Sequence, residues 1–182
     1  MKCHQKNVFS LYIVKGEKKV KIDDKTFSAI YEQYMNDVYR FAYSILKNHE
    51  DAENAMQDTF FKLYTSPPKN FTNIKSWLMS TSKHLCIDEI RRRKKETTIN
   101  LEIRRNIGNY TNGDGNQTQV LLFVSQLSKK YSEVVRLYYY GNLTIEEISK
   151  TLKISGSNVK KRLERARKKL NELMEENKNE SD

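Results

Sequence analysis

Apolar residues recur at steps of three and four along much of the chain, which is the spacing of one face of an α-helix. One such stripe covers residues 27–46, a second covers 52–63, and a third covers 74–90 and leads into a basic run. Pro67 and Pro68 stand between the second and the third, where a helix must end. The pattern predicts three helices, the first with its stripe at Phe27, Ile30, Tyr31, Tyr34, Val38, Phe41, Ile45 and Leu46.

Two of the expected helices begin at residues that cap free backbone amides. Asn48 precedes the second helix, and Asp51 follows at the third position, where a carboxylate also meets the positive end of the helix dipole. Thr144 and Glu147 have the spacing of a capping box, in which each side chain accepts from the other residue's amide. We therefore expect helices to start directly after Asn48 and Thr144.

The C-terminal half shows the same spacing in shorter pieces. Stripes at residues 120–127 and 134–139 predict two helices, and a short capped helix follows from Ile145. The segment KISGS interrupts it before a longer helix begins. The inner stripe of that last helix is Val159, Leu163, Ala166, Leu170 and Leu173, and its opposite face carries Lys160, Lys161, Arg162, Arg165, Lys168 and Lys169.

These elements predict an all-α fold of two small helical domains joined by a flexible linker. The domains are expected at residues 27–95 and 119–174. Residues 96–118 lack periodicity and are rich in Asn and Gly, a composition that favours a linker. An N-terminal arm, residues 1–26, has no helical period and stays unassigned, and a disordered tail is expected at 175–182.

The net charge and its distribution along the chain say more about possible partners than the overall composition does. Lys and Arg number 33 against 23 Asp and Glu, a net charge of +10 that favours a polyanion, with a membrane surface or an acidic protein as alternatives. Basic runs lie at residues 91–95 and 160–169, whereas acidic residues gather between Glu50 and Asp58. The chain is therefore expected to carry separate surfaces of opposite sign.

Cysteine and histidine usage points away from disulfides, metals and cofactors. Cys3 and Cys86 are far apart and form no CxxC pair, which suits a reducing cytosol and a cytoplasmic protein. The three histidines lack metal-ligand spacing, so no metal and no cofactor are expected. No apolar stretch approaches the ~18 residues of a membrane span, so no membrane insertion is expected. Residues 8–14 are only marginally long enough for a signal-peptide core, and no small-residue cleavage site follows them, which favours an ordinary N-terminal strand or a disordered arm.

The short capped helix, the tight turn and the basic helix after it have helix-turn-helix character. Such a cationic helix can enter the major groove of DNA, where Arg and Lys meet phosphates and guanine edges. A solvated helix or a coiled-coil seam is the alternative, because the apolar stripe also follows a heptad.

Three segments together resemble one family. LTIEEISKTLKISGSNVKKRLERARKKL is similar to the fourth conserved region of bacterial sigma factors, which reads the promoter −35 element. DAENAMQDTFFKLY resembles the acidic helix of their second region, which docks on the clamp helices of RNA polymerase. IKSWLMSTSKHLCIDEIRRRKK resembles the adjoining segment that binds and melts the −10 element. The absence of a central module between them points to the extracytoplasmic-function (ECF) group.

The resemblance implies a site and a partner for each surface. Polymerase contacts are implied for Asp51, Asn54, Gln57, Asp58 and Phe61. Contacts with −10 DNA are implied for Lys69, Asn70, Phe71, Trp77, Lys83, His84, Arg91 and Arg92, and contacts with −35 DNA for Ser157, Asn158, Lys160, Lys161, Arg162 and Arg165. The implied partners are core RNA polymerase, through its clamp helices and flap, promoter DNA and an anti-sigma factor.

The residues themselves leave alternatives open. Without the resemblance, the acidic face around Asp58 would be interpreted as merely solvated, and Trp77 as half-buried packing, because an indole gains most by burial. The sequence also departs from the common family pattern. His84 replaces Asn, Asn158 replaces Thr, and Glu164 adds an anion to the reading helix. In the helix-turn-helix, Ser149 and Lys153 replace Ala and Gly, and a non-Gly residue in a left-handed turn costs ~1 kcal/mol.

Two other functions remain for comparison. A helix-turn-helix regulator that binds DNA alone, similar to response regulators, would explain residues 119–173 but not the acidic helix followed by WLMSTSKHLCIDEIRRRKK. An enzyme acting on nucleic acid would need paired carboxylates, a phosphate-binding Gly loop or a nucleophile–base pair, and no such pattern is defensible. The sequence favours a non-catalytic specificity subunit of RNA polymerase.

Overall fold

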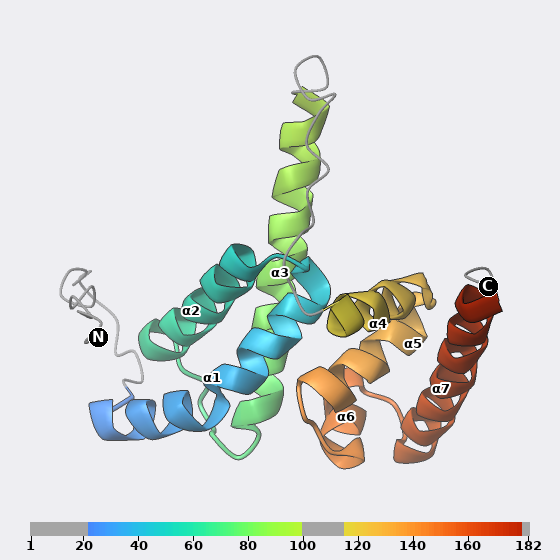
Figure 1. Cartoon of the computed structure of the whole chain (residues 1–182). Helices are drawn as coiled ribbons and strands as arrows, with labels where there is room; N and C mark the ends of the chain where they lie inside the picture. The colour runs from blue at the N-terminus through green and yellow to red at the C-terminus, as the bar shows by residue number, and fades with distance from the viewer. Residues whose placement is uncertain (1–21, 100–114, 180–182) are drawn as a thin grey trace.

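The computed structural model describes residues 22–99 and 115–179, and all regular structure within these ranges is helical. The predicted all-α fold is confirmed. Figure 1 shows the helices in two groups, α1 to α3 and α4 to α7, that lie against each other. The elements are α1 (Asp24–Leu46), α2 (His49–Thr65), α3 (Ile74–Ile99), α4 (Gly115–Gln126), α5 (Lys129–Val135), the π-helical turn η1 (Arg136–Tyr140), α6 (Ile145–Leu152) and α7 (Gly156–Asn179).

The starts of α1 and α2 are set by capping side chains. α1 begins before the apolar stripe at Phe27, because the Asp23 carboxylate accepts a hydrogen bond of 2.9 Å from an amide of the first turn. Asn48 caps α2 as predicted, and its side chain accepts from the Asp51 amide at 3.0 Å. Lys47 lies between the two helices with φ 55°, a left-handed residue that ends α1 and turns the chain.

The first group is a three-helix unit in which α1, α2 and α3 pack pairwise. Phe41 of α1, Phe60 and Leu63 of α2, and Leu78 of α3 are almost fully buried at its centre. Tyr31 extends this core as an aromatic cluster, with its ring 4.8 Å from that of Phe60 in an edge-on arrangement. The face of α2 that carries Phe60 and Leu63 is therefore fixed inward, and its opposite face remains on the surface.

The second group is organised around α7, which α4, α5 and α6 all contact. Its own core is a cluster drawn from three helices and one neighbouring residue. The members are Val124 of α4, Leu127 directly after α4, Tyr131 and Val135 of α5, and Ala166 of α7. The turn η1 continues α5 directly, so the helix predicted from the stripe at residues 134–139 is present, with a π-helical last turn.

Several predicted boundaries differ from the observed helix ends. α3 continues to Ile99 and α4 begins at Gly115, so both helices extend into residues predicted as linker. α7 continues to Asn179, and residues 175–179, predicted as part of a disordered tail, are helical. The residues at these three helix ends are mostly polar, so the apolar stripe that predicts each helix stops before the helix itself does. Residues 1–21, 100–114 and 180–182, which hold the rest of the predicted arm, linker and tail, lie outside the described residues.

The two groups share one hydrophobic core. Val38 of α1 and Met79 of α3 belong to the same buried cluster as Leu137 of η1, Ile148 of α6 and Val159 of α7. α1 contacts η1, and α3 contacts α6. In Figure 1 the C-terminal part of α3 projects away from this joint core, which leaves its basic end exposed. The sequence predicted two domains but not that they would pack together.

Candidate nucleic-acid and protein interfaces

The outer face of α2 carries most of the residues predicted to bind polymerase. Asn54, Gln57 and Asp58 are exposed, as the inward packing of the opposite face requires. Phe61 lies on the same surface with 47% of its area exposed, and Tyr64 adds a second exposed ring at 40%. Exposed rings beside amides and a carboxylate are typical of a protein-binding surface, because covering large apolar side chains with a partner lowers the free energy of the complex.

Asp51 differs from the other predicted polymerase contacts. Its carboxylate forms an ion pair with Arg93 of α3, and only 16% of the side chain is exposed. Arg93 also donates from Nε to Glu89 at 2.8 Å, so the pair ties the start of α2 to the second half of α3. Asp51 therefore has a structural role inside the three-helix unit, which its place in an acidic helix did not reveal.

The segment between α2 and α3 presents part of the predicted −10 surface. Lys69 and Asn70 are exposed, and the Asn70 side chain accepts a hydrogen bond of 2.7 Å from the Thr72 amide, which holds the turn. Phe71 and Trp77 are half-buried and pack against the core. The half-buried packing expected for Trp77 is thus present, and both residues remain partly exposed.

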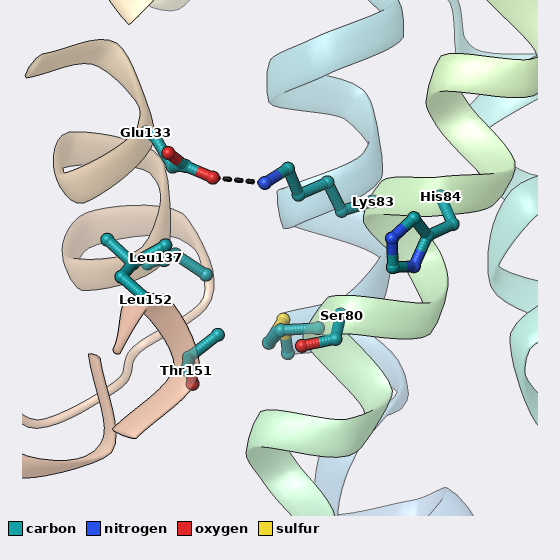
Figure 2. A pocket seen from close by; sticks show the side chains of 8 residues that line it. Ser80, Lys83, His84, Glu133, Leu137, Thr151 and Leu152 are labelled. Atoms are coloured by element: carbon teal, nitrogen blue, oxygen red, sulfur yellow. Dashed lines mark hydrogen bonds and ion pairs between the residues drawn. The ribbon is translucent and has the colours of Figure 1, made fainter. Parts of the chain in front are cut away.

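The basic residues of α3 fall into two settings. Arg91 and Arg92 are exposed near the projecting end of the helix and pair with Asp88 and Glu89 on the preceding turn. Lys83 is instead half-buried, and its Nζ forms an ion pair with Glu133 of α5. Figure 2 shows this pair joining the two groups of helices. The two side chains help to line a small pocket of about 160 Å³, together with Met79, Ser80, His84, Leu137, Thr151 and Leu152.

The helix-turn-helix is present as predicted. Thr144 and Glu147 form the capping box, with the Thr144 amide donating to Glu147 at 2.8 Å and the Glu147 amide donating to Thr144 at 3.2 Å. Lys153 adopts φ 54° and ψ 45°, the left-handed conformation expected where the family commonly has Gly. The Ser149 hydroxyl donates to the Ile154 carbonyl at 2.6 Å, which closes the turn with a bond that Ala could not make.

The last helix, α7, separates an apolar from a cationic face. Val159, Leu163 and Ala166 are buried, whereas most of its cations are on the surface. At its start the Asn158 amide donates to the Ser155 hydroxyl at 3.2 Å, and the Asn158 side chain accepts from Arg162. The exposed predicted −35 residues are Ser157, Asn158, Lys160, Lys161 and Arg165, while Arg162 is half-buried. Recognition helices contact base edges with such N-terminal residues.

The described residues hold no other strong chemical site. No group of His, Cys, Asp and Glu in residues 22–99 and 115–179 could hold a metal ion. Burial raises the pKa of the Cys86 thiol to about 12, so this cysteine is a packing residue rather than a nucleophile. Within the same ranges, no helix has both the length and the apolar character that crossing a bilayer requires.

Comparison with known proteins places these surfaces in one family. The model of sigma-70 region 2 matches residues 30–96, and that of sigma-70 region 4 matches residues 117–170. The ECF RNA polymerase sigma factor SigM of Bacillus subtilis is 34% identical over 154 residues, which cover 81% of this chain and 94% of SigM. The chain belongs to the ECF group of the sigma-70 family. SigW of the same organism is 28% identical over 88% of this chain and 95% of its own length.

Solved structures agree on the fold of this sigma factor. The sigma factor RpoE of Bartonella quintana, solved with the anti-sigma factor NepR, has a TM-score of 0.65 at 22% identity and covers 83% of this chain and 98% of its own. CnrH, solved with the cytosolic domain of CnrY, has a TM-score of 0.60 at 19% identity, with 84% and 90% covered. Region 2 thus corresponds to α1–α3, and region 4 to α4–α7.

Three polar residues of this sigma factor escaped prediction from the sequence. Glu133 pairs with Lys83, Arg136 donates from Nε to the Ser44 carbonyl at 3.2 Å, and Lys75 donates to the Asn142 carbonyl at 2.6 Å. Each of these contacts joins region 2 to region 4 across fifty or more positions of the chain. No local pattern marks such residues, because their partners are determined only by how the two regions pack.

Proposed function

We propose that this sigma factor binds core RNA polymerase with region 2 and directs it to promoters that carry a −10 and a −35 element. Residues 27–95 would hold polymerase and the −10 strand, and residues 119–174 would hold the −35 duplex. One observation carries the proposal: a single chain exposes an acidic, ring-bearing face on α2 and a cationic recognition helix in α7. A protein that bridges an enzyme and DNA needs both.

The α2 face supports the contact with polymerase. Asn54, Gln57, Asp58 and Phe61 form an accessible surface of amide, carboxylate and ring, suited to a basic protein partner such as the clamp helices. Asp51 would contribute indirectly, through the Arg93 ion pair that holds the start of α2. Region 4 would make the second contact, with the flap.

The DNA contacts follow from the chemistry of each surface. Opening a duplex requires cations for the backbone and accessible rings or pockets for unstacked bases. Lys69, Asn70, Phe71 and Trp77 provide these around the turn before α3, and His84, Arg91 and Arg92 continue the surface along α3. Lys83 joins them once Glu133 has moved away. On α7, Ser157, Asn158, Lys160, Lys161, Arg162 and Arg165 would meet the −35 groove.

We also propose the partners and setting of the protein. RpoE and CnrH were solved with NepR and with the cytosolic domain of CnrY, and this chain would likewise be held by an anti-sigma factor. It would act in the cytoplasm as a non-catalytic specificity subunit, with no cofactor. The alternative of a regulator that binds DNA alone is disfavoured by the exposed α2 face, which would then have no role.

The decisive experiment is transcription in vitro with purified core polymerase on a fragmented genomic library. We expect the protein to direct RNA synthesis from a small set of fragments, and their start sites to lie downstream of a shared pair of elements. A variant that loses both Lys160 and Arg165 to Ala should lose that set. If core polymerase with the wild-type protein starts nowhere above the level of core alone, and is not retained by it, the proposed function is wrong.

A further inference from the structure

One anion lies in the middle of the exposed face of α7. Val159 and Ala166 are fully buried, so they determine which side of the helix packs against the rest of region 4. A line of exposed residues lies on the opposite side, about 140–180° around the helix from Val159, and consists of Ser157, Lys161, Glu164 and Lys168. Glu164 is therefore central on the surface that would face a DNA groove.

Glu164 lies among the residues proposed to bind the −35 duplex. It directly precedes Arg165, and Lys160 and Lys161 lie within about one turn before it. At 1.5 Å per residue, it is only about 12 Å along the axis from Gly156, where the helix begins. A helix that places these cations against a groove therefore places the Glu164 carboxylate there as well.

The Glu164 carboxylate is available to a ligand. On α6, Glu146 pairs with Lys150 four positions later at 2.8 Å, the spacing at which helical ion pairs form. Within the part of the chain that the structure describes, no hydrogen bond or ion pair joins Glu164 to Lys160 or Lys168, which lie at the same spacing on either side of it. Its oxygens can therefore accept from a group outside the protein.

A carboxylate in the major groove is selective because DNA offers it few donors. An ionised Glu only accepts hydrogen bonds, and the phosphates of the backbone repel it. Guanine presents the acceptors N7 and O6, and thymine presents the acceptor O4. Adenine presents its N6 amine beside the N7 acceptor, whereas cytosine presents its N4 amine alone. Cytosine is therefore the base whose edge suits the Glu164 carboxylate best.

The cations beside Glu164 suit the other base of the same pair. The guanine opposite a cytosine presents O6 and N7, which accept from Lys or Arg. Lys161 lies about one turn before Glu164 on the same exposed line and carries such a donor. An acceptor and a donor on one helix face thus match the two edges of a C·G pair, whereas the reversed pair would set the carboxylate against a guanine oxygen.

We infer that Glu164 is a specificity-determining residue, which accepts a hydrogen bond from the N4 amine of a cytosine at one position of the −35 element. This inference rests on the proposed function. Glu164 acts mainly by lowering the affinity for the other bases at that position, because a carboxylate that faces an acceptor is repelled. Since Glu164 is a departure from the common family pattern, the cytosine is a preference of this chain rather than of the family.

Selection of DNA by the holoenzyme tests the inference. Each full-length variant is combined with core polymerase and allowed to bind a promoter library that is randomised at every position of the −35 element, and the retained DNA is sequenced. Glu164→Ala removes the carboxylate, and Glu164→Gln replaces it with an amide of the same shape. Glu172→Gln is the matched control, because Glu172 is an exposed residue about two turns further along α7.

We expect the wild type and the control to prefer cytosine over each other base by at least about fivefold at one position of the element. Glu164→Ala should lose this preference at that position and keep the preferences elsewhere. Glu164→Gln should shift the preference to adenine, because a Gln amide pairs with both N6 and N7 of that base. A switch from cytosine to adenine at a single position identifies direct contact with a base.

Unchanged base preferences in both Glu164 variants would show that the carboxylate reads no base. A uniform gain in affinity for all library members, with preferences intact, would show that Glu164 only repels phosphate. Either result overturns the inference and leaves the proposed function standing, because selection of a −35 sequence is retained. If the wild-type holoenzyme selects no −35 sequence at all, the proposed function fails and the inference fails with it.

Discussion

The Ser149 hydroxyl donates to the Ile154 carbonyl at 2.6 Å, across the turn that joins the two helices of the DNA-binding motif. The Ile154 amide returns a bond of 3.1 Å to the Ser149 carbonyl, so one residue holds both polar groups of the other. Between them Lys153 is in the left-handed conformation that favours Gly. Extra hydrogen bonding at Ser149 thus accompanies a strained residue at 153, and the angle between α6 and α7 depends on both.

Ser149→Ala should lower the free energy of unfolding by about 0.5–1 kcal/mol, because the lost hydrogen bond outweighs the better helix propensity of Ala. Urea unfolding followed by circular dichroism measures it. Ser125→Ala is the control, since the Ser125 hydroxyl bonds the Leu122 carbonyl of its own helix. Equal stability of the Ser149 variant and wild type would show that the hydroxyl does not hold the turn.

Lys153→Gly should raise the free energy of unfolding by about 0.5–1 kcal/mol, because Gly adopts a positive φ without the clash of a β-carbon. The same urea titration tests it. Lys168→Gly, in the exposed middle of α7, should instead lose about 1 kcal/mol. A loss of stability in both variants would mean that the strain at residue 153 is relieved in another way.

Asp51→Asn should destabilise region 2 by about 1–2 kcal/mol, since it removes the ion pair with Arg93 and an acid from the first turn of α2. Thermal and urea unfolding measure this change. Asp58→Asn, an exposed position on the same helix, should leave stability within about 0.5 kcal/mol of wild type. Equal effects of the two substitutions would contradict the structural role of Asp51.

The double variant Gln57→Ala with Asp58→Ala should weaken binding to core polymerase by at least about 1 kcal/mol, roughly fivefold, because both side chains lie on the proposed docking face. Binding of the region 4 helix to −35 DNA should not change. Glu32→Ala with Gln33→Ala removes one carboxylate and one amide from an exposed place on α1 and should leave the affinity intact. Undiminished affinity of the α2 variant would refute the docking face.

Arg165→Ala should reduce the affinity of holoenzyme for a promoter by about 1–3 kcal/mol and leave polymerase binding unchanged. The comparison is between the native promoter and one with a scrambled −35 element, for which the variant should show little loss. Arg167→Ala is the control on the same helix, because the Arg167 side chain donates to the Tyr139 hydroxyl at 2.8 Å. Loss of polymerase binding in the Arg165 variant would contradict the division between the regions.

Features with a short range along the chain were predictable. The helical stripes, the Asn48 cap and the Thr144–Glu147 capping box depend on residues within one turn of each other, so spacing alone identifies them. The left-handed residue at 153 was expected from the resemblance, because the family commonly has Gly there. The exposed faces of α2 and α7 follow from their buried faces, because a helix that packs one side must expose the other. Resemblance of three segments then assigned the family.

Tertiary structure decided how these parts are used. Asp51 stands in the acidic helix beside Asp58, yet only the packing of α3 brings Arg93 to it. Lys83 is one cation among many until Glu133, fifty residues later, pairs with it. Such contacts depend on where whole helices come to rest, which is set by the summed burial of a core drawn from both regions. A helical period specifies which side of α3 is buried, but not which helix covers it.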